Sequence, residues 1–198
     1  MECSSIYNRR SIRKFLNKAV SKDIIDEIID AGRMAPSAKN AQPWRYIVYG
    51  NKNKQELLDC MEAGIAREEK SISYMPKVKC GILFAKNTLK IMREAPIVIL
   101  VLNPKAKSPF SPISTGDRVF ELMDTLSIGA SIENILLRAE EIGLGTLWIA
   151  NTMYAYNELI EYLSVEEQLV GAIAVGYTDE KPPQPSRKKL EEIVEYRL

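Results

Sequence analysis

The sequence feature that most constrains the fold is the stretch DRVFELMDTLSIGASIENILLRAEEIG, residues 117–143. Its composition favours a long helix, and apolar side chains would lie nearly all the way round that helix. A helix of this kind needs packing partners on most of its sides. A single small domain can hardly supply them all, so the sequence predicts a long, buried central helix and a homodimer that helps to cover it.

Shorter segments on both sides of this helix predict a sheet packed by further helices. The expected strands are residues 44–50, 96–102, 146–150 and 169–177. Helices are expected at residues 22–34, 51–70, 85–94 and 154–163. The first of these would begin after Ser21 as N-cap and end before Pro36. The expected fold class is α+β, with a central, mostly antiparallel sheet of about four or five strands packed by helices.

The bulk properties narrow the class of protein. The 198 residues are expected to form one domain, residues 1–198, without repeats or a linker. A net charge of +1 gives no reason to expect nucleic acid as a partner, and the longest apolar run, Ala95 to Leu102, is too short to span a membrane. No secretory signal is visible, and three widely separated cysteines do not suggest disulfides, so a cytoplasmic location is expected.

The chain contains no histidine. This excludes Ser–His and Cys–His nucleophile pairs, histidine-containing metal sites and histidine as a general base. A CxxC motif and a P-loop are also absent, so no metal site and no catalytic side chain are expected. If the chain is an enzyme, a bound cofactor is expected to carry the chemistry.

Two motifs in the first quarter of the chain could bind a ligand. RRSIR, residues 9–13, gathers three arginines around a serine, and guanidinium groups match a phosphate well. The alternative is a solvated basic cluster. APSAKNAQPW, residues 35–44, combines two prolines and small residues with the polar groups of Ser37, Asn40 and Gln42, which suits a flat heteroaromatic ligand. An ordinary helix-to-strand connector would explain it too.

Two later motifs carry the same ambiguity. GLGTLWIAN, residues 143–151, could let a ligand approach the backbone closely, although a helix C-cap explains Gly143 equally well. It is not a dinucleotide fingerprint, because Trp148 stands where the third glycine should be. PSRKKL, residues 185–190, could bring Arg187 to a phosphate or could be a solvated run of charges.

Together, in this order and at these spacings, the four motifs resemble those of the FMN-dependent nitroreductase family, from about Tyr7 to the C-terminus. RRSIRKF is similar to the family's Arg-Arg/His-Ser-x-Arg/Lys motif, and PSAKNAQPW to its Pro-Ser-x-x-Asn-x-Gln-Pro-Trp loop. GLGTLWI resembles the turn after the long central helix, and VGYTDEKPPQPSRKKLEEIV the usual C-terminal segment. The resemblance implies the nitroreductase-like fold and a homodimer with an FMN site at each subunit interface.

The resemblance also implies roles for individual residues. Arg9, Arg10 and Ser11 would bind the phosphate and ribityl groups of FMN, and Arg187 would return to the phosphate. Arg13 would reach the N1/C2-carbonyl end of the isoalloxazine, where a cation stabilises the negative charge of reduced flavin.

The remaining site residues follow from the same resemblance. Those along the ring near N5 would be Trp148, Ile149, Ala150 and Asn151, with the Ala150 backbone N–H as a donor to N5. The opposite subunit would contribute Pro36, Ser37 and Asn40, and Gln42 of the same loop is also expected at the cofactor. The C-terminal segment, residues 178–198, would extend over the partner subunit.

The activity that this resemblance implies is a ping-pong oxidoreductase. NADH or NADPH would give a hydride to the flavin and leave, and a nitroaromatic, a quinone or an activated alkene would then accept the electrons. Two alternatives are a flavin-binding redox sensor or carrier without significant turnover, and specialised family chemistry such as reductive dehalogenation or flavin destruction. The irregular segment 70–81, without a strong period, lies where substrate choice is often set in the family.

Overall fold

The computed structural model of the chain describes residues 4–50, 53–70 and 79–198. Its strands are β1 (Arg45–Gly50), β2 (Ile97–Asn103), β3 (Gly145–Ile149) and β4 (Gln168–Gly176). They form a four-stranded sheet in the order β1-β2-β4-β3, and every neighbouring pair is antiparallel. The predicted α+β class and antiparallel sheet are therefore confirmed.

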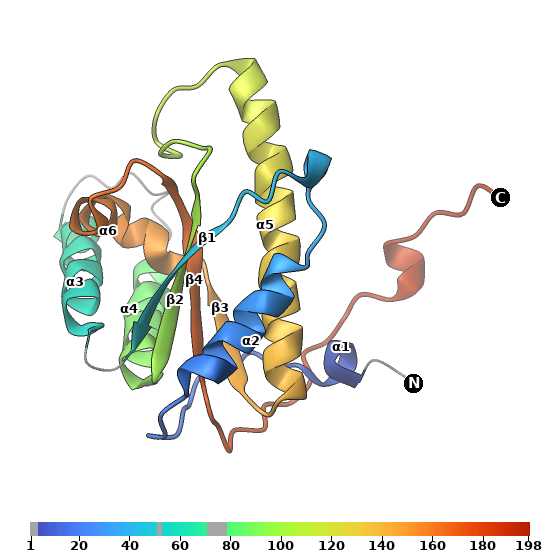
Figure 1. The fold of residues 1–198 in the computed structure, drawn as a ribbon, viewed down its shortest axis with the longest axis horizontal. Coiled ribbons are helices and arrows are strands. Elements are labelled where there is room, and N and C mark those ends of the chain that lie inside the picture. Colours follow the sequence, from blue (N-terminus) through green and yellow to red (C-terminus); the bar gives the residue numbers. More distant parts are fainter. Residues whose placement is uncertain (1–3, 51–52, 71–78) are drawn as a thin grey trace.

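Helices cover both faces of this sheet (Figure 1). On one face lie α3 (Gln55–Lys70), α4 (Lys79–Glu94) and α6 (Tyr156–Leu163), and on the other lie α2 (Lys22–Arg33) and α5 (Thr115–Glu141). The central strand β2 is buried along its whole length. Its side chains alternate, so Val98 and Leu100 join the core under α3 and α4, whereas Ile97 and Ile99 join the core under α2 and α5.

The helix boundaries follow local signals. The Ser21 hydroxyl oxygen accepts a hydrogen bond from the Ile24 N–H at 3.4 Å, and α2 ends at Arg33, before Pro36, as predicted. Helix α3 packs closely on the short helix η2 (Asn151–Ala155), because Gly64 has no side chain. A Cβ at Gly64 would lie 2.4 Å from the Ala155 Cα.

Helix α4 begins at Lys79, earlier than the predicted start at residue 85. The rest of the irregular segment, residues 71–78, lies outside the described residues. The prediction that this segment influences substrate choice is therefore not addressed by the structure.

The long helix α5 is buried only in its C-terminal half within one chain. Ile128, Ile132 and Ile135 are fully buried against the sheet and α2. In the N-terminal half, by contrast, four apolar side chains are more than half exposed: Val119, Phe120, Leu122 and Leu126. The apolar pattern of this helix thus exceeds what one copy of the chain can cover.

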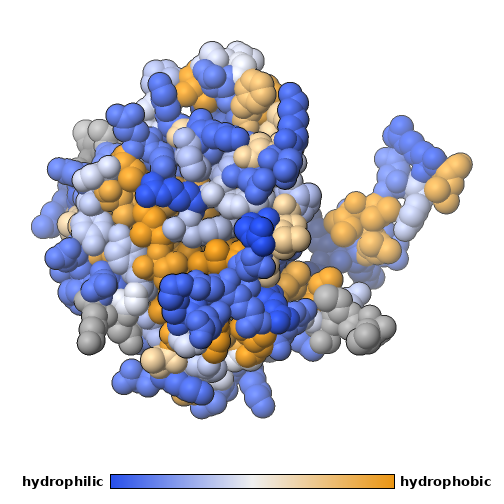
Figure 2. All heavy atoms as spheres, in the orientation of Figure 1, coloured by the Kyte–Doolittle hydropathy of each residue, from blue (hydrophilic) through white to orange (hydrophobic). Residues whose placement is uncertain are grey.

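The N-terminal helix packs against the body of the chain, whereas the C-terminal segment extends away from it. Helix α1 (Ser4–Asn8) packs beside the end of α5, where the Ser5 hydroxyl lies 3.3 Å from a Glu141 carboxylate oxygen. After β4 the chain leaves the body as an arm that contains only the short helix η3 (Leu190–Glu192) (Figure 1). Figure 2 shows apolar side chains on this arm, where Leu190 and Ile193 are both more than half exposed.

Among the residues that the structure describes, no helix has the length and apolar character that a membrane crossing requires.

Candidate functional site

The basic segment RRSIR is joined to the edge of the sheet. Ser11 pairs in parallel with Thr146 of β3, and the Ile12 N–H donates to the Thr146 carbonyl oxygen at 2.9 Å. The neighbouring Gly145 makes this approach possible, since a Cβ there would lie 2.8 Å from a side-chain carbon of Ile12. The arginines are therefore held at a fixed place beside β3 and do not form a free basic tail.

The three arginines of this segment have different surroundings. Arg9 is largely buried, and its Nε lies 3.4 Å from a Glu133 carboxylate oxygen on α5. The Arg10 guanidinium turns back to the Tyr7 and Arg9 carbonyl oxygens, at 2.6 and 2.8 Å. The exposed Arg13 guanidinium donates to the Ser11 carbonyl oxygen at 3.1 Å. Arg10 and Arg13 are thus held by neutral acceptors, which leaves their positive charge available to an anion.

The start of the C-terminal arm closes over the same segment. A Glu180 carboxylate oxygen accepts hydrogen bonds from the backbone N–H groups of Arg13 and Lys14, at 2.6 and 3.0 Å. The Thr178 hydroxyl donates to the Lys14 carbonyl oxygen at 2.7 Å. Arg187 lies farther along the arm, is exposed, and contacts only the Ser186 carbonyl oxygen, at 3.4 Å, among the described residues. One chain therefore does not bring Arg187 to the other arginines.

The far end of β3 offers a free backbone edge beside an exposed indole. Because the Thr146 carbonyl faces outward to Ile12, the two-residue period of a strand turns the backbone groups of Trp148 toward the same edge. The N–H of Ala150, just beyond the end of β3, follows the same period, whereas the Ala150 carbonyl accepts from the Met153 N–H at 3.3 Å. The Trp148 side chain is 44% exposed and lies over Gly129 of α5 and Gly171 of β4. A flat ring could lie against this edge and accept a hydrogen bond from it.

The neighbours of Trp148 and Ala150 anchor the edge in the core. Ile149 is buried in the core under α3, α4 and α6. The Asn151 side-chain amide donates to the Thr88 hydroxyl of α4 at 2.9 Å. These contacts hold the end of β3 rigidly, as a binding edge requires.

The loop of residues 36–42 has a strained backbone and lies away from the β3 edge. Lys39, Asn40 and Gln42 have φ values of 54°, 53° and 45°, which are uncommon for residues other than glycine. The Ser37 hydroxyl oxygen holds the turn by accepting from the Gln42 N–H at 3.0 Å. Strain of this kind concentrates at functional sites.

The same loop packs against the middle of α5, away from β3. Its Ala38 N–H donates to the Ser127 hydroxyl oxygen at 3.4 Å. Within the described part of the chain, no hydrogen bond or ion pair joins residues 36–42 to residues 9–13 or 148–151. The predicted site residues therefore fall into two separate groups in one chain.

Sequence reasoning missed the acidic partners of the basic segment. Glu133 and Glu180 are far from residues 9–13 in the sequence, and neither belongs to a recognisable spacing pattern. Their contacts depend on how α5 and the C-terminal arm pack against the N-terminal segment.

Comparisons with known proteins agree with the fold. The model of the nitroreductase family matches residues 6–177. A putative NADH dehydrogenase/NAD(P)H nitroreductase from Archaeoglobus fulgidus is 29% identical over 189 residues, which are 91% of this chain and 88% of the relative. An iodotyrosine deiodinase from Hydra vulgaris is 27% identical over 200 residues, 96% of this chain and 70% of the relative.

A solved structure gives the same result. The crystal structure of a putative nitroreductase in complex with FMN from Desulfovibrio desulfuricans superposes with a TM-score of 0.73 at 25% identity. The superposition covers 98% of this chain and 95% of that one.

Proposed function

Because the chain belongs to the nitroreductase family, we propose that it is an FMN-dependent oxidoreductase that takes electrons from NADH or NADPH. The Archaeoglobus relative is named for NAD(P)H, and the Desulfovibrio structure contains FMN. The acceptor would be a nitroaromatic, a quinone or an activated alkene. Reductant and acceptor would use the site in turn, so that NAD(P)H leaves before the acceptor binds.

The observation that carries this proposal is the pairing of the RRSIR segment with the edge strand β3. This pairing supports a common site for two segments: residues 9–13 beside Thr146, and residues 148–151, which run from the edge of β3 to just beyond its end at Ile149. The first offers cations to a phosphate, and the second offers backbone donors and an aromatic surface to a ring. FMN has both parts in one molecule.

The residues present fit FMN in a second respect. The Arg9 Nε is buried and makes no hydrogen bond of good geometry, although Glu133 is nearby. A buried donor without an acceptor is costly, and a phosphate oxygen at this place would reduce that cost. We propose that Arg9, Arg10 and Ser11 hold the phosphate and ribityl groups, with Arg187 as a further phosphate ligand.

The ring end of the proposed site contains Arg13 and residues 148–151. Bound FMN would supply the hydride-accepting centre, which no amino-acid side chain offers. Arg13 would stabilise the negative charge of the reduced ring near N1, and the Ala150 N–H would donate to N5. Trp148, Ile149 and Asn151 shape the surface on which the ring lies.

We further propose that the chain, a single domain over residues 1–198, works as a homodimer. The exposed apolar half of α5 supports this, as does the separation of the strained loop from β3 within one chain. In the dimer, Pro36, Ser37, Asn40 and Gln42 complete the FMN site of the partner. The arm of residues 178–198 extends over the partner, which buries Leu190 and Ile193 and brings Arg187 to a phosphate.

A second candidate function is reductive dehalogenation, favoured by the match to a deiodinase over 96% of this chain. A flavin-binding sensor or carrier without turnover is a third. For the cellular location we propose the cytoplasm, which the odd number of widely separated cysteines supports.

The test is a stopped-flow screen of the purified protein with NADH, NADPH and a panel of acceptors. We expect rapid bleaching of the flavin by a reduced nicotinamide and recovery of colour with menadione or a nitroaromatic. Parallel lines in double-reciprocal plots are expected from alternating occupancy of one site. Release of the cofactor by heat and chromatography should identify FMN; FAD, or no flavin after reconstitution, would refute the proposal.

A further inference from the structure

Three polar side chains form a row along α5, which packs against α2 (Figure 1). Ser127, Ser131 and Asn134 are spaced at helical intervals, so they lie on one face of α5. Ser131 is fully buried, and Ser127 is only 7% exposed. A buried polar group is costly unless it is hydrogen-bonded, so the partners of this row indicate why it is polar.

The row holds the last turn of α2. The Ser131 hydroxyl donates to the Gly32 carbonyl oxygen at 2.6 Å, and the Asn134 side-chain amide donates to the Ala31 carbonyl oxygen at 3.1 Å. Gly32 permits this approach, because a Cβ there would lie 2.6 Å from a side-chain carbon of Ile135. Carbonyl groups in the last turn of a helix lack regular helical partners. The row therefore fixes the end of α2 where the chain enters the loop of residues 36–42.

The chain that leaves this loop reaches the same serine. Tyr46 lies in β1, after the loop, and its hydroxyl is hydrogen-bonded to the Ser131 hydroxyl. Because the Ser131 proton is directed to Gly32, the Tyr46 O–H is the donor in this pair. Burial raises the pKa of Tyr46 above its ordinary value, so the donor keeps its proton at neutral pH. One buried hydroxyl thus joins the segments on both sides of the loop.

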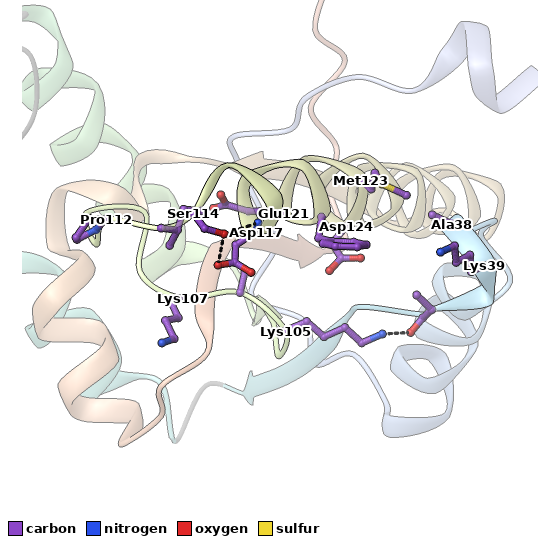
Figure 3. Close-up of a pocket in the computed structure, with 14 residues that line it drawn as sticks. Ala38, Lys39, Lys105, Lys107, Pro112, Ser114, Asp117, Glu121, Met123 and Asp124 are labelled. Atoms are coloured by element: carbon purple, nitrogen blue, oxygen red, sulfur yellow. Dashed lines mark hydrogen bonds between the residues drawn. The ribbon is translucent and has the colours of Figure 1, made fainter.

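The loop itself has weaker contacts with its surroundings. The Ala38 N–H donates to the Ser127 hydroxyl oxygen at 3.4 Å, and the Lys105 ammonium donates to the Ala41 carbonyl oxygen at 2.9 Å (Figure 3). Lys105 is exposed, so water competes for the second bond. Left-handed conformations such as those in this loop persist only where the surrounding structure imposes them. The buried contacts of Ser131 are the ones that water cannot replace.

We infer that Ser131 is a positioning residue for the cofactor site and acts through the loop of residues 36–42. The inference rests on the proposed function, in which this loop completes the FMN site of the partner. Ser131 fixes the segments before and after the loop, and the loop then presents Ser37 and Asn40 in one conformation. Without this hydroxyl the loop samples other conformations, and the apparent affinity for FMN falls with the fraction that is competent to bind.

Ser131→Ala is the central variant, since it removes both hydrogen bonds and leaves the Tyr46 hydroxyl without this partner. We expect the dissociation constant of FMN to rise roughly 5–30-fold, the factor that corresponds to the loss of a buried hydrogen bond. The recovery of flavin fluorescence on dilution of the FMN-loaded protein measures this constant. Hydrogen exchange of residues 33–45, measured by mass spectrometry on the full chain as purified, should become faster.

Tyr46→Phe provides a second variant with a smaller perturbation. It keeps the ring and removes only the hydroxyl, so Ser131 stays bonded to Gly32. FMN affinity and exchange should change in the same direction as in Ser131→Ala, but less. In the double variant no tyrosine hydroxyl is left unpaired, so the combined effect should be smaller than the sum of the two.

Leu58→Ala is the control for a general loss of stability. Leu58 is buried in the core under α3, on the opposite face of the sheet from α5, and its truncation leaves a cavity. FMN affinity and the exchange of residues 33–45 should stay at the parent values. Each variant should also sediment as the parent does, so that a change in association does not explain a change in FMN affinity.

The outcomes separate this inference from the proposed function. Parental FMN affinity in Ser131→Ala, with or without faster exchange of the loop, would overturn the inference, as would an equal loss of affinity in Leu58→Ala. A parent protein that binds no flavin after reconstitution would overturn the proposed function, and with it the role of this loop at the cofactor. Hydrogen exchange needs no flavin, so it would still show whether Ser131 holds the loop.

Discussion

Replacing Ala150 with proline tests the proposed site at one backbone atom. The outward-facing Thr146 carbonyl and the strand period turn the Ala150 N–H to the free edge of β3. Proline deletes that N–H, and the φ of −100° at Ala150 is within reach of proline's value of about −65°. Removal of one preorganised donor in a closed site costs roughly 10²–10³-fold in rate. Ala150 is exposed in one chain, and a donor in a less closed site contributes less. We therefore extend the lower end of the range and expect the rate of flavin reduction to fall by about 10–1000-fold.

The assay is stopped-flow bleaching of the oxidised flavin by NADH or NADPH. Ala150→Gly is the matched control, since it keeps the N–H and removes only an exposed methyl group, and it should react near the parent rate. The comparison requires that both variants bind FMN and sediment as the parent does. A folded, yellow Ala150→Pro protein that is reduced at the parent rate would show that this N–H does not face the flavin.

Four further predictions follow from the same structure. Leu126→Glu, at a side chain that is 76% exposed, should leave the chain folded by circular dichroism but shift sedimentation from a dimer of twice 22.4 kDa toward the monomer. Arg13→Gln should lower the flavin midpoint potential in a redox titration while FMN stays bound, because other arginines still hold the phosphate. Lys54→Met should lower the free energy of unfolding in urea by about 1–3 kcal/mol, since the buried ammonium donates to three carbonyls at the end of α4. Burial, with the nearby Tyr162, raises the pKa of Tyr49 to about 12. The pKa of tyrosine in the unfolded chain is about 10, so the free energy of unfolding should fall as the pH rises above about 10. Tyr49→Phe should reduce that fall.

Much of the fold could be predicted because local patterns and tertiary structure agree. The apolar run that forms β2 is buried on both faces, and the cap at Ser21 begins α2 where the sequence places it. Prediction failed where local signals are weak. The first turn of α4, from Lys79, contains Gly81, a residue that disfavours a helix, so the sequence predicts a start that is too late. Helix α1 is short and depends on its packing beside α5.

The candidate site also has a part that the sequence predicts and a part that it does not. The types of residue that bind a phosphate and a ring are visible in the motifs, because they depend on chemistry and spacing. The pairing of Ser11 with Thr146 is not visible, since it joins distant parts of the chain at a sheet edge. The left-handed conformations of Lys39 and Gln42 are also hidden, because neither residue favours them; surrounding contacts such as that of Ser37 impose them.

The exposed apolar half of α5 and the division of the site have a common consequence. If Pro36–Gln42 and the β3 edge belong to one FMN site only across a dimer, cofactor binding and association share a coupling free energy. By reciprocity, FMN strengthens the dimer by the factor by which association strengthens FMN binding. Leu126 belongs to neither group of site residues, so it should influence FMN affinity through association. The apolar pattern of α5 that first constrained the fold would then also determine whether a complete site can form.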